Sequence, residues 1–325
     1  MRLTLKIDGQ HHSTVARVGS LVLAVGALAL GQADRRASVA ERVGRLTRDS
    51  GWTETAAVPL RFRTHHPQGL VGANDAFYLS SVEVKTRTRR FAAPVDGLDR
   101  DAGAGTGHLF RFDRDGRLLG QVTLGEGTIY HPGGIDYDGA HVWVPVAEYR
   151  PNSRSIVYRV DPRTMTAAEV FRVPDHIGAI VHDTDDGALY GVSWGSRRFY
   201  RWALAEGGQG IQGGASDARW RVNGSHYVDY QDCKYVGGRR MLCTGVADLR
   251  PAGTGGLATA LRLGGLELVD LGDGRPLHQV PVRLWTTGGV PLTQNATWFE
   301  PTATGLRGYF LPEDDTSTLY VYEVE

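Results

Sequence analysis

The chain has 325 residues, a formal net charge of zero and a pI near 7.2. This balance argues against nucleic-acid binding, which needs a basic face to neutralise phosphates. The 43 glycines and the 9% of aromatic residues are typical of many short strands joined by tight turns.

The N-terminus has the pattern of an export signal. Basic residues precede an apolar stretch at 18–30, and Gly31-Gln32-Ala33 offers the small-x-small pattern that signal peptidases cleave. The stretch falls short of the ~20 apolar residues of a membrane span. We therefore predict a signal peptide at 1–33 and a secreted single domain at 34–325, with no membrane contact after cleavage; a retained N-terminal anchor is the alternative. A short helix is expected at 37–48.

An internal repeat organises the rest of the chain. Four segments open with histidine and continue into an apolar strand, and each is followed by a polar or glycine-containing break and a second apolar run. The segments begin at His66, His131, His176 and His226. A repeat that places one histidine at the same point of each unit can bring these histidines together in space.

The first two units align without gaps over 18 residues. Tyr78 then matches Trp143, and Glu83 matches Glu148, each glutamate lying 17 residues after its histidine. In the C-terminal unit Trp298 takes the histidine position, which predicts an incomplete histidine ring with one open side.

Four short antiparallel strands per unit are the signature of propeller blades. The fold class is therefore all-β, a single β-propeller whose blades begin near residues 66, 131, 176, 226 and 298. The strand-like stretch at 53–62 is expected to complete the last blade and close the ring, which removes exposed sheet edges. We predict five blades, with six as the alternative if the insert at 246–262 contains strands.

Two cysteines flank a turn signal. Cys233 and Cys243 lie on either side of Gly237-Gly238-Arg239-Arg240, so a turn centred on Gly238 places them opposite each other. We expect a cross-strand disulfide in an oxidising compartment, with two reduced thiols as the alternative.

The inner strand of each blade lines the axis of a propeller, so the four histidines should surround one channel mouth. Neutral imidazoles from separate blades suit a divalent metal ion, and the predicted ligands are His66, His131, His176 and His226. The same face offers acid–base groups, and the predicted catalytic residues are His131, His226, Glu148 and Glu83. The alternative for each histidine is a hydrogen bond to a neighbouring blade and no further role.

Further side chains on this face are predicted to bind substrate: Arg150, Trp194, Arg197 and Tyr230. The arginines suit an anionic ligand, although surface salt bridges are an equally simple explanation for them. Tyr230 is a candidate proton donor, and aromatic packing is the alternative for it.

Several runs resemble a known family. They include His65-His66-Pro67-Gln68-Gly69, Tyr130-His131-Pro132-Gly133-Gly134 and Gly191-Val192-Ser193-Trp194-Gly195. These runs are similar to a domain of unknown function found in exported propeller-like proteins of actinobacteria and fungi. The resemblance implies a propeller and export, and it carries over no catalytic residue. Gluconolactonases, strictosidine-synthase-like proteins and propeller polysaccharide lyases are similar in architecture alone.

Two function classes follow from these patterns. The first is an extracellular lyase or hydrolase that acts on a carbohydrate or another small polar, anionic substrate, with one divalent metal ion as its candidate cofactor. The second is a non-catalytic propeller that binds a glycan or a protein. Nucleophile-elbow, P-loop, Rossmann and zincin motifs are absent from the sequence. The expected partner is a small molecule or glycan, and a monomer is expected.

Overall fold

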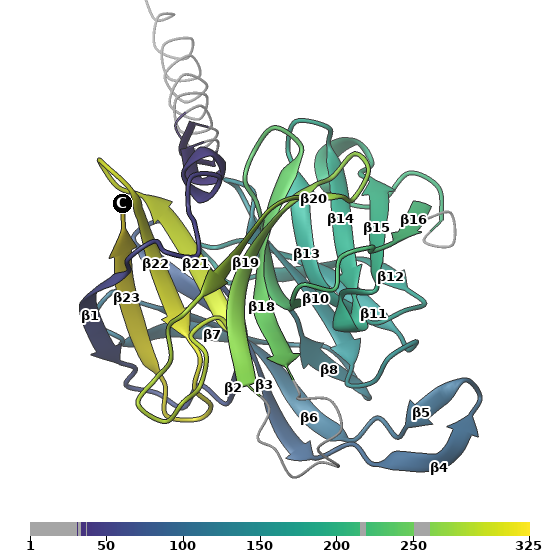
Figure 1. The fold of residues 1–325 in the computed structure, drawn as a ribbon. Coiled ribbons are helices and arrows are strands. Elements are labelled where there is room, and N and C mark those ends of the chain that lie inside the picture. Colours follow the sequence, from purple (N-terminus) through teal and green to yellow (C-terminus); the bar gives the residue numbers. More distant parts are fainter. Residues whose placement is uncertain (1–30, 32–33, 37, 215–218, 250–260) are drawn as a thin grey trace, which may run out of the picture.

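A computed structural model describes residues 31, 34–36, 38–214, 219–249 and 261–325. These residues form five antiparallel blades arranged in a ring, together with a separate two-stranded hairpin (Figure 1). The prediction of a five-bladed propeller is confirmed. The predicted signal peptide lies outside the described residues apart from Gly31. The part of the 246–262 insert at 250–260 lies outside them as well.

Each blade has four strand positions between the axis and the outer edge of the ring. From the axis outward, blade 1 contains β2 (His66–Ala73), β3 (Ala76–Thr86), β6 (Ala104–Phe112) and β7 (Leu118–Leu124). In blade 2 the inner strand is split, and the strands are β8 (Ile129–Pro132) with β9 (Asp136–Tyr137), β10 (Val142–Glu148), β11 (Ser155–Val160) and β12 (Ala167–Val173). Blade 3 contains β13 (Ile177–Asp183), β14 (Ala188–Ser193), β15 (Arg198–Ala203) and β16 (Arg219–Val222).

The remaining blades follow the same order. Blade 4 contains β17 (Asp229–Tyr235), β18 (Arg240–Leu249), β19 (Leu261–Asp270) and β20 (Pro276–Val282). Blade 5 contains β21 (Ala296–Pro301), β22 (Leu306–Leu311), β23 (Thr318–Val324) and β1 (Thr53–Pro59). The N-terminal strand β1 therefore closes the ring beside β23, as predicted. Short 3-10 turns lie at η1 (Trp194–Ser196) and η2 (Glu206–Gly208).

Burial falls from the inner strands to the outer ones. All seven residues of β10 are buried, whereas β7 alternates between exposed and more buried positions. Tyr78 and Trp143, which the repeat aligns, are both fully buried on the second strands of their blades. The outer strands alternate with a period of 2 because only one of their sides is buried. The inner strands are continuously apolar because both of their sides are buried.

The ring has two distinct faces. From one face, β4 (Arg90–Val95) and β5 (Leu98–Arg100) project as a hairpin inserted between β3 and β6 (Figure 1). On the opposite face, helical residues at 34–36 and 38–43 pack against blades 4 and 5. On this side Arg36 donates to the backbone oxygen of Tyr137 and to Thr184 Oγ1 at 3.3 Å. We call these the hairpin face and the helix face.

The inner strands approach one another closely at the axis. A Cβ on Gly69 would lie 2.6 Å from the backbone nitrogen of Ile135, and one on Gly133 would lie 2.1 Å from the carbonyl oxygen of Gly178. Only glycine permits such contact between neighbouring blades. The glycines that follow the histidines in the repeat are therefore required by packing.

A buried carboxylate ties the blades together at this axis. Asp232 accepts hydrogen bonds from the backbone nitrogens of blades 1, 2 and 5, at Leu70 (2.9 Å), Ile135 (3.2 Å) and Thr297 (3.1 Å). It is also paired with the buried ammonium of Lys234, which donates in turn to the carbonyl oxygen of Ile135. Burial raises the pKa of the Asp232 carboxyl to about 6, although Lys234 opposes the shift. The centre of the ring is thus occupied by a structural polar network.

Beside Asp232, Cys233 pairs with Cys243 across β17 and β18, and the two form a disulfide. The predicted cross-strand bridge is confirmed.

Candidate functional site

Three of the four predicted histidines form a row on the hairpin face. His66 begins β2, His131 lies in β8, and His176 directly precedes β13. The ring centroids of His66 and His131 are 6.4 Å apart, and those of His131 and His176 are 6.0 Å apart. The repeat therefore brings side chains from three consecutive blades together, as the shared register predicts.

The three imidazoles have different partners. The Nδ1 atom of His66 lies 2.7 Å from Asp314 Oδ1, and its side chain is 29% exposed. His176 Nδ1 lies 2.8 Å from the carbonyl oxygen of Glu148 and so donates to it. His131 is 5% exposed, and neither of its ring nitrogens has a hydrogen-bond partner among the described residues. An unpartnered polar side chain in this setting is costly, which marks His131 as unusual.

Burial keeps the two inner imidazoles neutral. It lowers the pKa of His176 to about 4. It also lowers the pKa of His131 well below the usual range, and the neighbouring His176 and His66 act in the same direction. Both rings are therefore uncharged at neutral pH, with one lone pair each.

Aromatic side chains cover this row. The ring of Tyr149 stacks on His131 with centroids 4.1 Å apart, and Trp194 meets His176 edge-on at 4.8 Å. Arg100, at the end of the projecting hairpin, lies over Trp194 at 5.2 Å. Trp194 thus lies in the cluster where substrate binding was predicted, and the hairpin is anchored to it.

Glu148 is saturated with donors. It is 1% exposed and accepts hydrogen bonds from Thr128, Arg150 and Arg154. Burial alone would raise its pKa, but the hydrogen bonds from Thr128, Arg154 and Arg150 hold it below the usual value. Glu148 is therefore a fixed anion that orients Arg150. The predicted catalytic residue Glu148 and the predicted substrate-binding residue Arg150 form an ion pair with each other.

Glu83 occupies the matching position in blade 1 but has a different environment. It lines an open pocket of about 470 Å³ on the hairpin face, and its nearest ion-pair partner is Lys85 at 3.6 Å. The other polar side chains that line this pocket are Arg63, His65, His66, Arg87, Thr88, Tyr149, Asp314 and Asp315. We call it the hairpin-face pocket. Its volume lies within the usual range for small-molecule sites.

The fourth histidine does not continue the row. His226 lies three residues before β17, is exposed, and has its Nδ1 atom 2.6 Å from Arg197 Nη1. Arg197 also pairs with Asp229 at 3.2 Å. These two predicted residues form a surface cluster beside blade 4, because the inner strand there begins later than the repeat implied.

Tyr230 is buried between blades 3 and 4, where it stacks on Phe199 with centroids 6.3 Å apart. A register shift in β17 between Tyr230 and Asp232 turns Asp232, rather than Tyr230, toward the axis. The packing alternative therefore describes Tyr230 better than a role in substrate binding.

The prediction that Trp298 takes the fifth histidine position is wrong. Trp298 is the third residue of β21 and lines a second cavity, of about 340 Å³, beside the N-terminal helical residues on the helix face. The residue directly before β21 is Asn295, which is buried and donates to the carbonyl oxygen of Pro312 at 2.9 Å. The strand begins earlier than the alignment of the aromatic positions implied.

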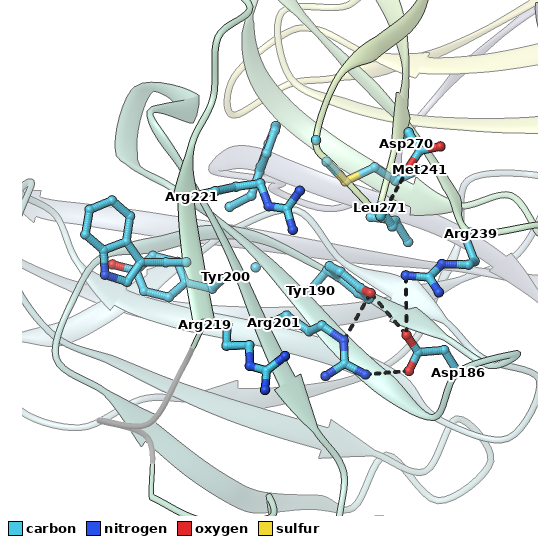
Figure 2. Close-up of a pocket in the computed structure, with 15 residues that line it drawn as sticks. Asp186, Tyr190, Tyr200, Arg201, Arg219, Arg221, Arg239, Met241, Asp270 and Leu271 are labelled. Atoms are coloured by element: carbon cyan, nitrogen blue, oxygen red, sulfur yellow. Dashed lines mark hydrogen bonds and ion pairs between the residues drawn. The ribbon is translucent and has the colours of Figure 1, made fainter.

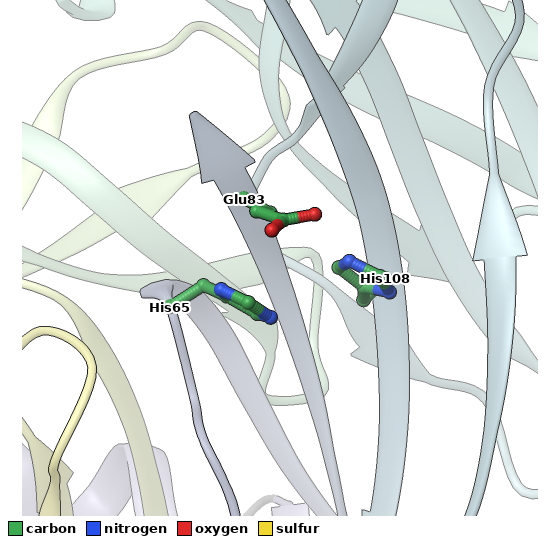
Figure 3. Close-up of side chains that lie close together, drawn as sticks. All are labelled: His65, Glu83 and His108. Atoms are coloured by element: carbon green, nitrogen blue, oxygen red, sulfur yellow. The ribbon is translucent and has the colours of Figure 1, made fainter. Parts of the chain in front are cut away.

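Sequence reasoning missed two histidines. His65, Glu83 and His108 bring their ligand atoms within 4.8 Å of one another (Figure 3). Within the described ranges this is the one group of three or more His, Cys, Asp or Glu side chains with such spacing, and the predicted set of His66, His131, His176 and His226 does not reach it. The His65-His66 doublet was a usable signal, but His108 follows the 85–107 insert and lies outside the repeat register.

A third hollow of about 320 Å³ lies on the flank of blades 3 and 4 and is rich in arginine (Figure 2). Arg201 and Arg239 both turn toward Asp186, at 2.7 Å and 3.9 Å. Arg219 and Arg221 have no ion-pair partner in the part of the chain that the structure describes. None of the three histidines of the row lines this hollow.

A family model matches residues 25–325 of the chain. The chain belongs to DUF6454, a family of unknown function. No curated protein matches it. The membership agrees with the resemblance to a propeller-like family of unknown function, and it assigns no activity to this DUF6454 protein.

Several solved structures of low sequence identity are similar to the DUF6454 chain in fold. A luciferin-regenerating enzyme is 9% identical with a TM-score of 0.42, and the match covers 82% of this chain and 94% of that one. The allergen Mala s 1 of Malassezia sympodialis is 9% identical with a TM-score of 0.41, covering 84% and 97%. A tail fiber of Staphylococcus aureus phage P68 is 8% identical with a TM-score of 0.44, covering 85% and 53%.

Among the described residues, no helix has both the length and the apolar character needed to cross a membrane.

Proposed function

We propose that this DUF6454 protein is an enzyme, a hydrolase or lyase, that acts on a carbohydrate or another small polar, anionic substrate in the hairpin-face pocket. The observation that carries the proposal is the His66–Asp314 pair. The Asp314 Oδ1 atom lies 2.7 Å from Nδ1 of the His66 imidazole. His66 lines the open pocket, and its Nε2 atom has no hydrogen-bond partner among the described residues. A carboxylate that fixes the orientation of an imidazole is a recurring arrangement for proton transfer.

The remaining lining groups support this chemistry. Glu83 provides a second carboxylate in the same pocket, suited to accept a proton or a sugar hydroxyl. Arg87 lines the pocket and has no ion-pair partner in the described part of the chain, so it is available to an anionic substrate group. In this proposal His66 and Glu83 take the acid–base roles, and the buried His131 lies beside His66 and stacks on Tyr149.

The experiment is a turnover screen with sugar lactones, uronides and carboxylate or phosphate esters, followed by His66→Gln and Asp314→Asn on any active substrate. We expect kcat to fall by about 10²–10⁴ in His66→Gln, the usual contribution of a positioned acid–base group, and by less in Asp314→Asn. The matched control is His182→Gln, because His182 forms an equivalent pair with Asp138 at 2.9 Å on the helix face. Equal kcat values in His66→Gln and the unmodified protein would contradict the assignment.

A non-catalytic role in glycan binding is the second candidate. It is favoured by one observation, the aromatic pair of Tyr149 and Trp194, whose centroids lie 5.8 Å apart beside the pocket. Saturable binding of an oligosaccharide without turnover, weakened in Tyr149→Ala, would support this candidate over the enzyme.

We also propose that the protein is exported and works in an oxidising compartment. The Cys233–Cys243 disulfide supports this, because such bonds persist where thiols are not kept reduced.

A further inference from the structure

His65, Glu83 and His108 come from three adjacent segments of blade 1. His65 directly precedes β2, Glu83 lies near the end of β3, and His108 lies in β6. Ser81 is paired with His108, and Glu83 follows Ser81 by two residues, so Glu83 and His108 project from the same face of the sheet. Figure 3 shows the three side chains turned toward a common space.

The backbone of His65 is adapted to this arrangement. Its φ angle is 57°, in the left-handed region that non-glycine residues rarely adopt. Its carbonyl oxygen accepts a hydrogen bond from the nitrogen of Asp315 at 2.5 Å, which fixes the turn. As a result the two consecutive histidines diverge: His66 pairs with Asp314, while the ring of His65 stacks on His108.

His108 is partly buried, and its ring nitrogens are chemically unsatisfied. Neither of its ring nitrogens has a hydrogen-bond partner in the described part of the chain, although both nitrogens are shielded from solvent. Burial lowers the pKa of His108 and also that of His65. Neutral imidazoles with free lone pairs are the form in which histidine binds metal ions.

We propose that His65, Glu83 and His108 bind a divalent first-row transition metal ion such as Zn²⁺, with the open coordination positions facing the hairpin-face pocket. Two imidazoles and one carboxylate are a ligand set used by catalytic zinc sites and by related iron sites, which keep positions open for water or substrate. His65 and Glu83 both line the pocket, so those positions adjoin the His66–Asp314 pair.

Binding requires a local contraction of the site. The two imidazole rings are stacked with centroids 5.1 Å apart and planes 12° apart, so their lone pairs do not converge on one point. The ligand atoms now lie within 4.8 Å of one another. They must approach one another more closely if each is to lie about 2.0–2.2 Å from a zinc ion. We expect this contraction to come from rotation of the half-buried His65 ring and of the Glu83 side chain about their side-chain bonds.

Ion binding goes beyond the proposed enzyme function, and only its role in turnover rests on that function. When the ion is bound, Glu83 serves as its ligand and the acid–base role falls to His66 alone. A metal-bound water has a pKa near neutrality and would supply a nucleophile next to the substrate.

The test is isothermal titration of the metal-stripped full-length protein with Zn²⁺. We expect one site per chain with a Kd in the micromolar range or below, and a Kd at least tenfold weaker in His108→Phe and in Glu83→Gln. The control is His141→Gln, a histidine on the helix-face side of blade 2, which should bind within about twofold of the unmodified protein. A Co²⁺ complex should show d–d absorption bands that His108→Phe removes.

Absence of saturable Zn²⁺ binding overturns the proposal. Unchanged affinity in both His108→Phe and Glu83→Gln overturns it as well, because the ion would then lie elsewhere. Glu83 is partly exposed, so Glu83→Gln keeps the test valid if His108→Phe fails to fold. Zinc binding without turnover of any substrate would support this site and count against the proposed enzyme function alone. Turnover by the metal-free protein would support the enzyme function and contradict a role of the ion in turnover.

Discussion

The centre of the ring and the His65–Glu83–His108 group both place polar side chains within the β-ladders, yet they differ in how those side chains are satisfied. Asp232 has a donor for each carboxylate oxygen, from three other blades and from Lys234. His108, in contrast, has two ring nitrogens without a partner among the described residues. The first arrangement joins the blades through satisfied polar groups, whereas the second costs stability that a bound ligand would recover.

Hydrogen-bond satisfaction distinguishes structural polar residues from candidate functional ones more clearly than burial does. Asp232 and His131 are both nearly inaccessible, but of the two only His131 has hydrogen-bonding atoms without a partner in the described ranges. Buried polar groups that hold a fold together are expected to be satisfied, whereas those that act on a ligand are often left open.

The largest expected effect is at the centre of the ring. Asp232→Ala leaves the buried ammonium of Lys234 without its partner and three backbone nitrogens without an acceptor. We expect the free energy of unfolding to fall by about 3–5 kcal/mol, the range for breaking a buried pair. Urea unfolding followed by tryptophan fluorescence measures this.

Two comparisons make that result specific. Asp49→Ala removes an exposed carboxylate paired with Arg48 at 3.7 Å and should change the free energy of unfolding by no more than about 0.5 kcal/mol. The double variant Asp232→Ala/Lys234→Met should recover part of the loss, because it removes the unpaired charge. A loss below about 1 kcal/mol in Asp232→Ala would show that the network is not what joins the blades.

An intermediate effect is expected from pH. The pKa of His176 is lowered by burial to about 4, while the unfolded value is near 6.5. The unfolded chain therefore binds the proton first, so the free energy of unfolding decreases as pH falls from about 6.5 to 4, by about 3 kcal/mol from this residue. In His176→Asn, which can still donate to Glu148, the decrease over that range should be smaller by a similar amount. Parallel pH profiles of the two proteins would contradict the assignment.

The smallest expected effect has the opposite sign. His108→Phe removes two unsatisfied buried nitrogens and extends the stack on Phe110, which lies 5.2 Å from His108. We expect the metal-free protein to gain about 0.5–1 kcal/mol in the free energy of unfolding while it loses zinc binding. A clear loss of stability in this variant would show that His108 is structural and would weaken the contrast with Asp232.

Much of the fold could be predicted from the sequence, because blade periodicity is written in local patterns. The inner strands begin within a few residues of the predicted positions, and the turn at Gly238 places Cys233 opposite Cys243. The errors arose where a single residue shifts a strand: the irregularity before Asp232 that buries Tyr230, and the early start of β21 that places Trp298 on the helix face.

The candidate site was less predictable. The repeat located the row of His66, His131 and His176, but it could not show that Asp314 would approach His66 from the far end of the chain. His65 reaches His108 only because of a left-handed backbone angle, and the pairing of β3 with β6 spans a long insert. Such contacts depend on tertiary structure and have no local pattern.

Closure of the ring has a consequence for biosynthesis. Strand β1 is translated before the other strands of the ring, whereas its partner β23 is translated after all of them. Blades 1 to 4 can form in order during synthesis, while β1 waits with an unpaired edge and blade 5 must overcome the entropy of closing a very long loop. The fraction of chains that fold correctly is therefore set by the pairing of β1 with β23. A destabilising substitution in β23 should lower the yield of soluble protein far more than it lowers the activity of the molecules whose ring has closed.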